Sequence, residues 1–354
     1  MNKKLYMLIF STLFCFCAKS QTSWIKQTSG TKNALTSVYF SNENFGYAIG
    51  DKGTILKTSD GGLNWILDTS NIIGNLTSVY AIKNTCYIVG QTSILTKDHF
   101  GVGLIYKTDE LNKKWSLTKT EFGVYADYLK SVYFVTKDTG FIVGLAGLIL
   151  KTSNGGKDWL VQNIVKPGDS YYNLESVYFI DSNNGFAVGG FADTIDVILK
   201  TVNGGSTWIK QQSSSKQYLN SVYFSDLNTG YIVGGSMREK NGIILKTTDR
   251  GLTWKRQLYE KPDEFYYEFK SVFFTDSITG YTVGSSVAMS PYKKIVKIDK
   301  VDGLILKTVD GGNKWVKQES GVSNVLLSIF FSNKNVGYIV GDKGIILKFH
   351  NGDN

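Results

Sequence analysis

Short stretches of alternating apolar and polar residues recur along most of the chain, always in the same order. The order is L-x-S-V-Y-F (as in residues 35–40), G-Y-x-V-G (230–234), I-L-K-T (55–58) and W-x-x-Q (208–211). Alternation over such short stretches predicts β-strands with one buried face. Each unit therefore predicts four strands, which we name A, B, C and D.

The units number seven. Strand A begins at seven places: Leu35, Leu76, Leu129, Leu174, Leu219, Phe269 and Leu326. A tryptophan stands at the start of strand D in each unit: Trp24, Trp65, Trp115, Trp159, Trp208, Trp254 and Trp315. Units of about 40–50 residues with four short strands are typical of propeller blades. We number the blades one to seven in the order of their A strands.

The seventh unit lacks a strand D at its end, and the chain has an extra one at its start. The unit ends at residues 351–354 without a tryptophan, whereas residues 24–27 have the strand D pattern. We expect this N-terminal strand to close the last blade, because a closed ring leaves no end blade unpaired. The predicted fold is all-β: a single seven-bladed β-propeller of four-stranded blades over residues 21–354.

Residues 1–20 read as a signal peptide, with two early lysines, an apolar run over 5–17 and a mature start near Gln21. The apolar run is too short to span a bilayer. Cys15 and Cys17 each follow a phenylalanine, which argues against a lipoprotein. The expected location is secreted, or periplasmic and in the cell envelope, with no transmembrane segment in the mature chain.

Composition excludes several kinds of chemistry. The chain has two histidines, His99 and His350, and Cys86 is the one cysteine outside the predicted signal, so we predict no metal site, no cofactor and no internal disulfide. The net charge is +9, or +6 without residues 1–20. Each strand C ends in a lysine: Lys57, Lys107, Lys151, Lys200, Lys246, Lys307 and Lys348. We expect these lysines to form a dispersed, solvated ring, which does not favour nucleic-acid binding.

The turn between strands C and D resembles the Asp-box of sialidase-type propellers. The aspartate side chain of the box is expected to accept backbone N–H bonds, and its tryptophan is expected to pack between neighbouring sheets. The residues concerned are Asp60, Trp65, Asn154, Trp159, Asn203, Trp208, Asp249, Trp254, Asp310 and Trp315, with Glu110 in a degraded box in blade two. Because asparagine replaces aspartate in two boxes, we predict a structural role and no calcium.

The whole blade pattern, G-Y-x-V-G followed by L-K-T-x-D-G-G-x-x-W, resembles the photosystem II stability/assembly-factor-like family, also called BNR or Asp-box repeat propellers, in its secreted bacterial branch. The resemblance covers nearly all of residues 21–354. It implies the propeller fold and, from the family's assembly factors, protein binding without catalysis.

Connection lengths distinguish the two faces of the expected propeller. The A–B and C–D connections have nearly constant lengths, whereas the B–C connections range from three residues to nineteen in blade six, residues 285–303. Loops on a rigid scaffold are where binding function usually lies. We therefore place function on the face of the B–C and D–A connections.

That face is also rich in tyrosine, which suits protein or sugar partners. The candidate partner-binding residues are Tyr125, Tyr128, Tyr171, Tyr172, Tyr218, Tyr266, Tyr267, Lys293 and Lys294. We expect a monomer that binds a protein partner, and a glycan remains open.

Enzymatic chemistry finds little support in the residues. A sialidase needs three arginines from separate blades, but Arg238, Arg250 and Arg256 all fall close together. The Asp-box propellers that cleave xyloglucan use two propellers. Two carboxylates across the channel, such as Glu175 with Asp127 or Asp169, could in principle perform glycoside hydrolysis, but no sequence feature singles them out. We predict a non-catalytic binding propeller, with a carbohydrate-binding or glycoside-hydrolase-like propeller as the alternative.

Overall fold

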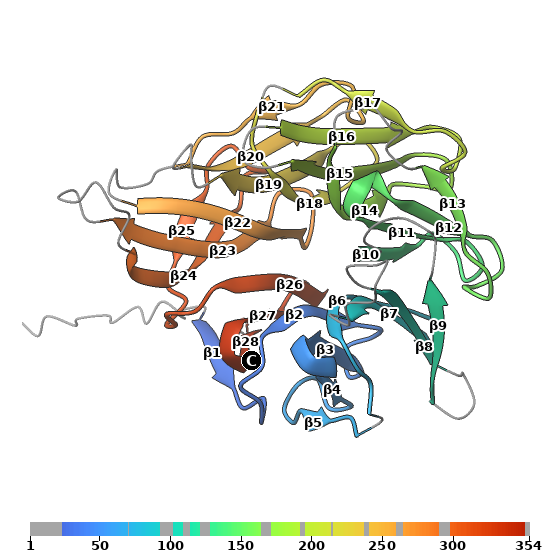
Figure 1. Cartoon of the computed structure of the whole chain (residues 1–354). Helices are drawn as coiled ribbons and strands as arrows, with labels where there is room; N and C mark the ends of the chain where they lie inside the picture. Colours follow the sequence, from blue (N-terminus) through green and yellow to red (C-terminus); the bar gives the residue numbers. More distant parts are fainter. Residues whose placement is uncertain are drawn as a thin grey trace, which may run out of the picture.

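The computed structural model shows a ring of seven antiparallel four-stranded sheets around a central axis (Figure 1), which confirms the predicted propeller. The residues it describes are 23–69, 71–92, 102–108, 114–120, 128–163, 171–191, 195–213, 215–236, 241–259, 265–289 and 298–350. Among these residues no helix is long and apolar enough to cross a membrane.

The strands run from the inner strand A to the outer strand D in each blade. Blade one consists of β2 Leu35–Phe40, β3 Gly46–Gly50, β4 Ile55–Thr58 and β5 Ile66–Leu67. Blade two consists of β6 Asn75–Ile82, β7 Thr85–Thr92, β8 Val102–Thr108 and β9 Trp115–Thr120. Blade three consists of β10 Leu129–Phe134, β11 Gly140–Gly144, β12 Ile149–Thr152 and β13 Leu160–Asn163. Blades four and five consist of β14 Asn173–Phe179, β15 Gly185–Phe191, β16 Ile195–Thr201 and β17 Ile209–Gln211; and β18 Leu219–Phe224, β19 Gly230–Ser236, β20 Asn241–Thr247 and β21 Lys255–Arg256.

Blade six consists of β22 Phe265–Phe274, β23 Gly280–Met289, β24 Ile298–Thr308 and β25 Val316–Gln318, and blade seven of β26 Leu326–Asn333, β27 Val336–Gly341, β28 Ile345–His350 and β1 Ser23–Gln27. Three short 3-10 turns, η1 Asp51–Gly53, η2 Leu145–Gly147 and η3 Asp342–Gly344, form the three-residue B–C connections.

The N-terminal strand closes the ring, as predicted. β1 pairs antiparallel with β28 from Ser23 opposite His350 to Gln27 opposite Ile346. The Trp24 ring packs against Phe349 and Phe331 of blade seven and against Tyr281 of blade six. β1 thus lies beside β28 as the outer strand of the last blade (Figure 1), and its tryptophan links that blade to blade six.

A ring of serine hydrogen bonds joins the seven inner strands. The third residue of every strand A is a serine whose Oγ accepts the N–H of the fourth residue of the next blade, at 3.2–3.4 Å. The bond from Val38 N–H to Ser328 Oγ links blade one to blade seven and completes the circle. These bonds cap the edge of an inner strand that would otherwise be open.

A ring of aromatic side chains lies at the fifth position of the same strands. It consists of Tyr39, Tyr80, Tyr133, Tyr178, Tyr223, Phe273 and Phe330, whose adjacent centroids are 4.6–5.4 Å apart. The hydroxyls of Tyr80 and Tyr133, among others, donate to the carbonyl at the sixth position of the next blade. Burial raises the pKa of Tyr178 to about 12, which keeps its hydroxyl a donor. We call this set the aromatic girdle.

The hydrophobic core lies between adjacent blades. The Trp254 ring packs edge-on against Phe186 of blade four and Phe224 of its own blade five, and the equivalent tryptophans follow the same pattern. Cys86 is fully buried in the core between blades one and two. Burial raises the pKa of its thiol, so the group stays protonated and acts as a small apolar side chain.

The Asp-box turns are stabilised by hydrogen bonds to the side chain of their aspartate or asparagine. Asp60 Oδ1 accepts the Thr58 hydroxyl at 2.8 Å and the Asn64 N–H at 2.9 Å. Asn154 and Asn203 accept the equivalent two bonds. A side chain at Gly62 would meet the Tyr338 ring of the neighbouring blade, since a Cβ there would lie 2.7 Å from its nearest atom. The box is therefore built to lie flush against the preceding blade.

Removal of the closing strand should open the ring. Deleting residues 21–30 removes β1 and the Trp24 contacts, and we expect the free energy of unfolding to fall by at least roughly 3–5 kcal/mol, the range for losing a large core aromatic. Urea unfolding measures the change. Ile25→Lys, on the exposed side of the same strand, serves as control and should change stability by less than about 0.5 kcal/mol. A deletion variant as stable as the parent would contradict closure by β1.

The Asp-box aspartates should set part of the acid dependence of stability. Hydrogen bonds from Asn64 and from Thr253 hold the pKa values of Asp60 and Asp249 down to about 2. Their stabilising effect is complete above the unfolded-state pKa of about 4 and is lost as the pH falls towards 2. The double variant Asp60→Asn, Asp249→Asn should keep the fold, as blades three and four do, and show a flatter urea midpoint between pH 4 and 2. An unchanged acid dependence would contradict this assignment.

Candidate functional site

The two faces of the propeller differ in structure, as their connection lengths suggested. We call the side of the A–B and C–D connections the constant face and the opposite side the variable face. In blade six the nineteen residues predicted as a loop are largely strand, because β23 and β24 continue their pairing through Ser286–Asp302 to Ala288–Lys300. β22 is extended with them, from Phe265 opposite Ala288. The prediction of a long loop is therefore corrected to a three-stranded ribbon above the variable face.

The blade-six ribbon is braced against blade five, and this changes one predicted site residue. Tyr267 is 3% exposed. Its ring stacks on Tyr259 at 5.9 Å, and the Tyr259 hydroxyl donates to the Gly242 carbonyl of blade five. Tyr267 is therefore a packing residue and not a partner-contacting one. Alternation along β22 leaves the half-buried Tyr266 and Glu268 on the opposite side of the ribbon.

The other predicted tyrosines divide by exposure. Tyr171 is 41% exposed and meets the 42% exposed Phe191 edge-on at 5.3 Å. Tyr172 packs partly buried against the core between blades three and four, and Tyr128 is half-buried beside β10. Tyr125, Lys293 and Lys294 lie outside the described residues.

The rim of the central channel on the variable face is formed by the second residue of each strand A. In three blades this residue caps the next blade's first carbonyl: Thr36 Oγ1 donates to Leu76 at 2.7 Å, Thr77 Oγ1 to Leu129 at 2.7 Å and Asn220 Nδ2 to Phe269 at 2.8 Å. The remaining four second positions are Lys130, Glu175, Lys270 and Leu327. The rim is thus capped on part of its circle only.

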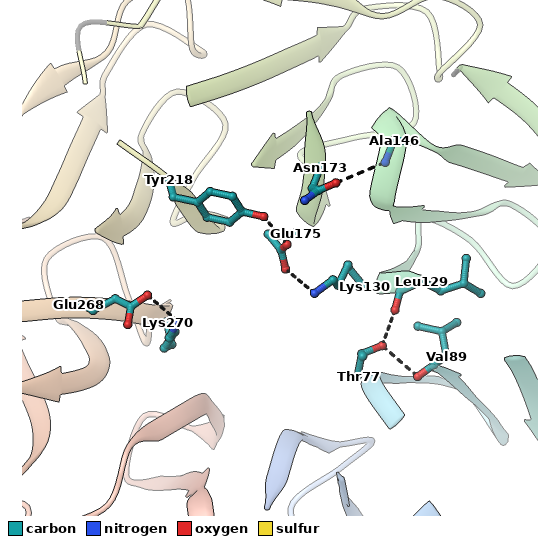
Figure 2. A network of polar contacts seen from close by, with 10 residues as sticks. All are labelled: Thr77, Val89, Leu129, Lys130, Ala146, Asn173, Glu175, Tyr218, Glu268 and Lys270. Carbon is teal, nitrogen blue, oxygen red and sulfur yellow. Dashed lines mark hydrogen bonds and ion pairs between the residues drawn. The ribbon is translucent and has the colours of Figure 1, made fainter. Parts of the chain in front are cut away.

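Blades three to five carry a chain of polar contacts at this rim (Figure 2). The Tyr218 hydroxyl donates to Glu175 Oε1 at 2.6 Å, and Lys130 Nζ lies 3.4 Å from Glu175 Oε2. Across the channel, Lys270 Nζ donates to Glu268 Oε1 at 2.6 Å (Figure 2). Burial and the Glu175 charge raise the pKa of Tyr218, so its hydroxyl is a fixed donor. Tyr218, a predicted contact residue, therefore orients Glu175.

The carboxylate pairs suggested for glycoside hydrolysis are not brought together in the described residues. Glu175 is occupied by Tyr218 and Lys130, and its suggested partners Asp127 and Asp169 lie outside the described chain. Arg250 Nε donates to Asn228 on the constant face, and Arg256 lies on the outer strand β21. These two arginines therefore form no clamp at the rim. No cluster of three or more histidine, cysteine or acidic side chains suited to a metal occurs among the described residues.

The strand C lysines are not the solvated ring that the sequence suggested. In five blades the ammonium donates to a carbonyl of the next blade's Asp-box at 2.6–2.9 Å, as in Lys246 to Gly311 and Lys348 to Gly61. All seven lie 5.4–6.0 Å from the centre of a strand B aromatic ring. The mistake has a physical cause: an alternation pattern shows which side of a strand a residue occupies but not that the next blade covers it. Five of these lysines therefore staple neighbouring blades, whereas Lys57 pairs with Asp68.

Sequence reasoning identified the second positions but missed the Lys130–Glu175–Tyr218 chain. Tyr218 precedes its strand and Glu175 belongs to the neighbouring blade, 43 residues away. The signal that could have found it was the run of two opposite charges at second positions in consecutive blades, since neighbouring inner strands place these side chains side by side.

Comparison with known proteins shows a family match and solved structures of similar fold. A model of the family described as photosynthesis system II assembly factor YCF48 matches residues 17–102 and 107–218, more than half of the chain. YCF48 from Cyanidioschyzon merolae superposes with a TM-score of 0.69 at 18% identity, over 93% of this chain and 99% of that one. YCF48 bound to a D1 peptide superposes with a TM-score of 0.68 at 16% identity, over 92% and 95% of the two chains.

A glycoside hydrolase has the same fold. The GH74 xyloglucanase from Xanthomonas campestris superposes with a TM-score of 0.67 at 12% identity, over 94% of this chain and 54% of that one. At these identities the superpositions show a shared fold alone. No curated protein matches the chain.

The lysine staples should stabilise the fold measurably. Lys200 is buried, its Nζ donates to the Arg250 carbonyl at 2.8 Å, and burial lowers its pKa. Lys200→Met keeps the apolar stem but removes the bond, and we expect a loss of roughly 1.5–3 kcal/mol in urea unfolding. Lys255→Met, on the exposed strand β21, should change stability by less than about 0.5 kcal/mol. Equal effects in the two variants would contradict the staple.

Proposed function

Because this chain belongs to the photosynthesis system II assembly factor YCF48 family, we propose that it is a non-catalytic propeller that holds a segment of a partner protein on its variable face. The observation that carries the proposal is the blade-six ribbon. Its three strands are extended together in register, and one side is buried against blade five. An insertion under no functional constraint would be expected to lengthen a loop. The ribbon is instead hydrogen-bonded and packed, and it forms a rigid surface beside the channel rim.

A protein segment is the kind of ligand that these surfaces favour. A family relative has been solved bound to a D1 peptide, which supports a peptide as the ligand class here. Aromatic side chains with polar groups around them are typical of protein-binding surfaces. Tyr171 with Phe191 in blade four and Tyr266 on the ribbon supply such side chains around the polar rim.

We also propose that the protein acts outside the cytoplasm, on the strength of the signal pattern in residues 1–20. Expression in the native host followed by N-terminal sequencing of the purified protein tests this. We expect a start near Gln21 in the envelope or secreted fraction. An uncleaved start at Met1 would contradict export through this signal.

The binding face can be tested by paired surface variants. The variable-face variant carries Tyr171→Ser, Phe191→Ser and Tyr266→Ala, and the constant-face control carries Leu63→Ser and Leu252→Ser, both 70% exposed in the parent. A partner is first captured from the envelope fraction and identified, and its affinity for each purified variant is then measured. We expect the variable-face variant to weaken binding by roughly 2 kcal/mol or more, because a few aromatic side chains carry most interface energy.

The same measurements separate the competing outcomes. A loss of affinity in the control alone would place the partner on the constant face and contradict the proposal. Incubation with a glycan panel, followed by product analysis, provides the second arm, and turnover of any glycan would contradict a non-catalytic function.

A further inference from the structure

The inner strands have open edges at the channel, and side chains of the preceding blade cap N–H and C=O groups along them. At the rim, the carbonyl of the first residue of strand A accepts a bond from Thr36, Thr77 or Asn220 of the blade before it. Each such cap uses one lone pair of the rim carbonyl for a bond within the protein. Three of the seven rim carbonyls are accounted for in this way.

The other four rim carbonyls belong to Leu174, Leu219, Leu326 and Leu35. Glu175 and Leu327, which precede two of them, have no donor to offer. Lys130 and Lys270, which precede the other two, pair with the carboxylates of Glu175 and Glu268 and not with a carbonyl. Among the described residues, the uncapped arcs of the rim therefore combine carbonyl oxygens with two carboxylates, and both groups are acceptors.

The girdle limits what can enter below the rim. From the second to the fifth position of strand A is about 10 Å at the rise of a β-strand. Seven ring centroids spaced 4.6–5.4 Å apart lie on a circle of about 6 Å radius, as closed seven-bladed symmetry requires. The rings' own van der Waals thickness narrows the opening below this radius. Aromatic faces also attract a cation.

We propose that the rim between blades three and five binds a basic side chain, lysine or arginine, of the partner. This rests on the proposed protein-binding function and adds the chemistry of the contact. The incoming ammonium or guanidinium donates to Glu175 and to the carbonyls of Leu174 and Leu219. In the free protein the Lys130 ammonium pairs with Glu175 and so takes the place that we assign to the partner's basic group.

The Lys130–Glu175 contact is one that a ligand can replace. Its N–O distance is 3.4 Å and the Lys130 side chain is 29% exposed, so Lys130 can move into solvent at little cost. Glu175 stays in place because the Tyr218 hydroxyl holds its other oxygen at 2.6 Å. Tyr218 is thus a positioning residue, and Glu175 is the recognition residue.

A set of matched peptides tests the proposal without the natural partner. The probes are acetylated, amidated pentapeptides, Gly-Gly-X-Gly-Gly, with X as Lys, Arg, Gln or Glu, and binding is followed by ligand-observed NMR. We expect Lys and Arg to bind and Gln and Glu not to. Glu175→Gln should weaken Lys-peptide binding by at least roughly tenfold, as expected for a charge-assisted bond. Lys130→Met should strengthen it by roughly threefold or more, because an internal competitor is gone.

The opposite pattern would overturn the proposal. Binding of the Glu peptide that is lost in Lys130→Met and retained in Glu175→Gln would make the rim a carboxylate site, and absence of binding by all four probes would show no such site. Thermal melting of each variant confirms that it is folded, and the gain in Lys130→Met cannot arise from misfolding. The partner-affinity test on Tyr171, Phe191 and Tyr266 is separate, so the rim proposal and the proposed function can fail independently.

Discussion

The structure depends on capping the open edge of each inner strand by the blade before it. Serine Oγ atoms accept the fourth N–H, and tyrosine hydroxyls donate to the sixth carbonyl, around the channel. An unpaired strand edge is a liability in any β protein, and here each blade supplies its neighbour's missing partners. No blade is complete alone, so the ring must close, and β1 closes it by pairing with β28.

The same dependence explains why one face has nearly constant connection lengths. The Gly61 N–H donates to Asn44 of its own A–B turn, while its carbonyl accepts both the Tyr338 hydroxyl and the Lys348 ammonium of the preceding blade. A longer or shorter turn would lose all three contacts together. Constant length on this face is therefore a packing requirement. On the variable face the B–C connections differ in length from blade to blade, and in blade six this connection carries the ribbon.

The candidate site lies where the capping rule is interrupted. Thr36, Thr77 and Asn220 continue the caps at the rim, whereas Lys130, Glu175 and Lys270 use their charges on one another or on Glu268. A hydroxyl or amide at those positions would satisfy the neighbouring carbonyl as it does elsewhere. Charged side chains at these positions therefore leave the neighbouring rim carbonyls without this internal hydrogen bond. These carbonyls and Glu175 are then acceptors at the channel, next to the blade-six ribbon.

The sequence by itself determined the fold. Strand alternation, a repeated tryptophan and the strand D pattern at the N-terminus are all local patterns that can be recognised along the chain. It also determined the box turns, whose bonds join residues four apart, such as Asp60 and Asn64. Tertiary structure alone decided what lies between blades: the burial of Tyr267, the stapling role of Lys200 and the pairing of Tyr218 with Glu175. The Lys200 and Tyr218 contacts join residues 50 and 43 positions apart. All three features depend on how neighbouring sheets twist and pack, which no alternation pattern within a single strand records.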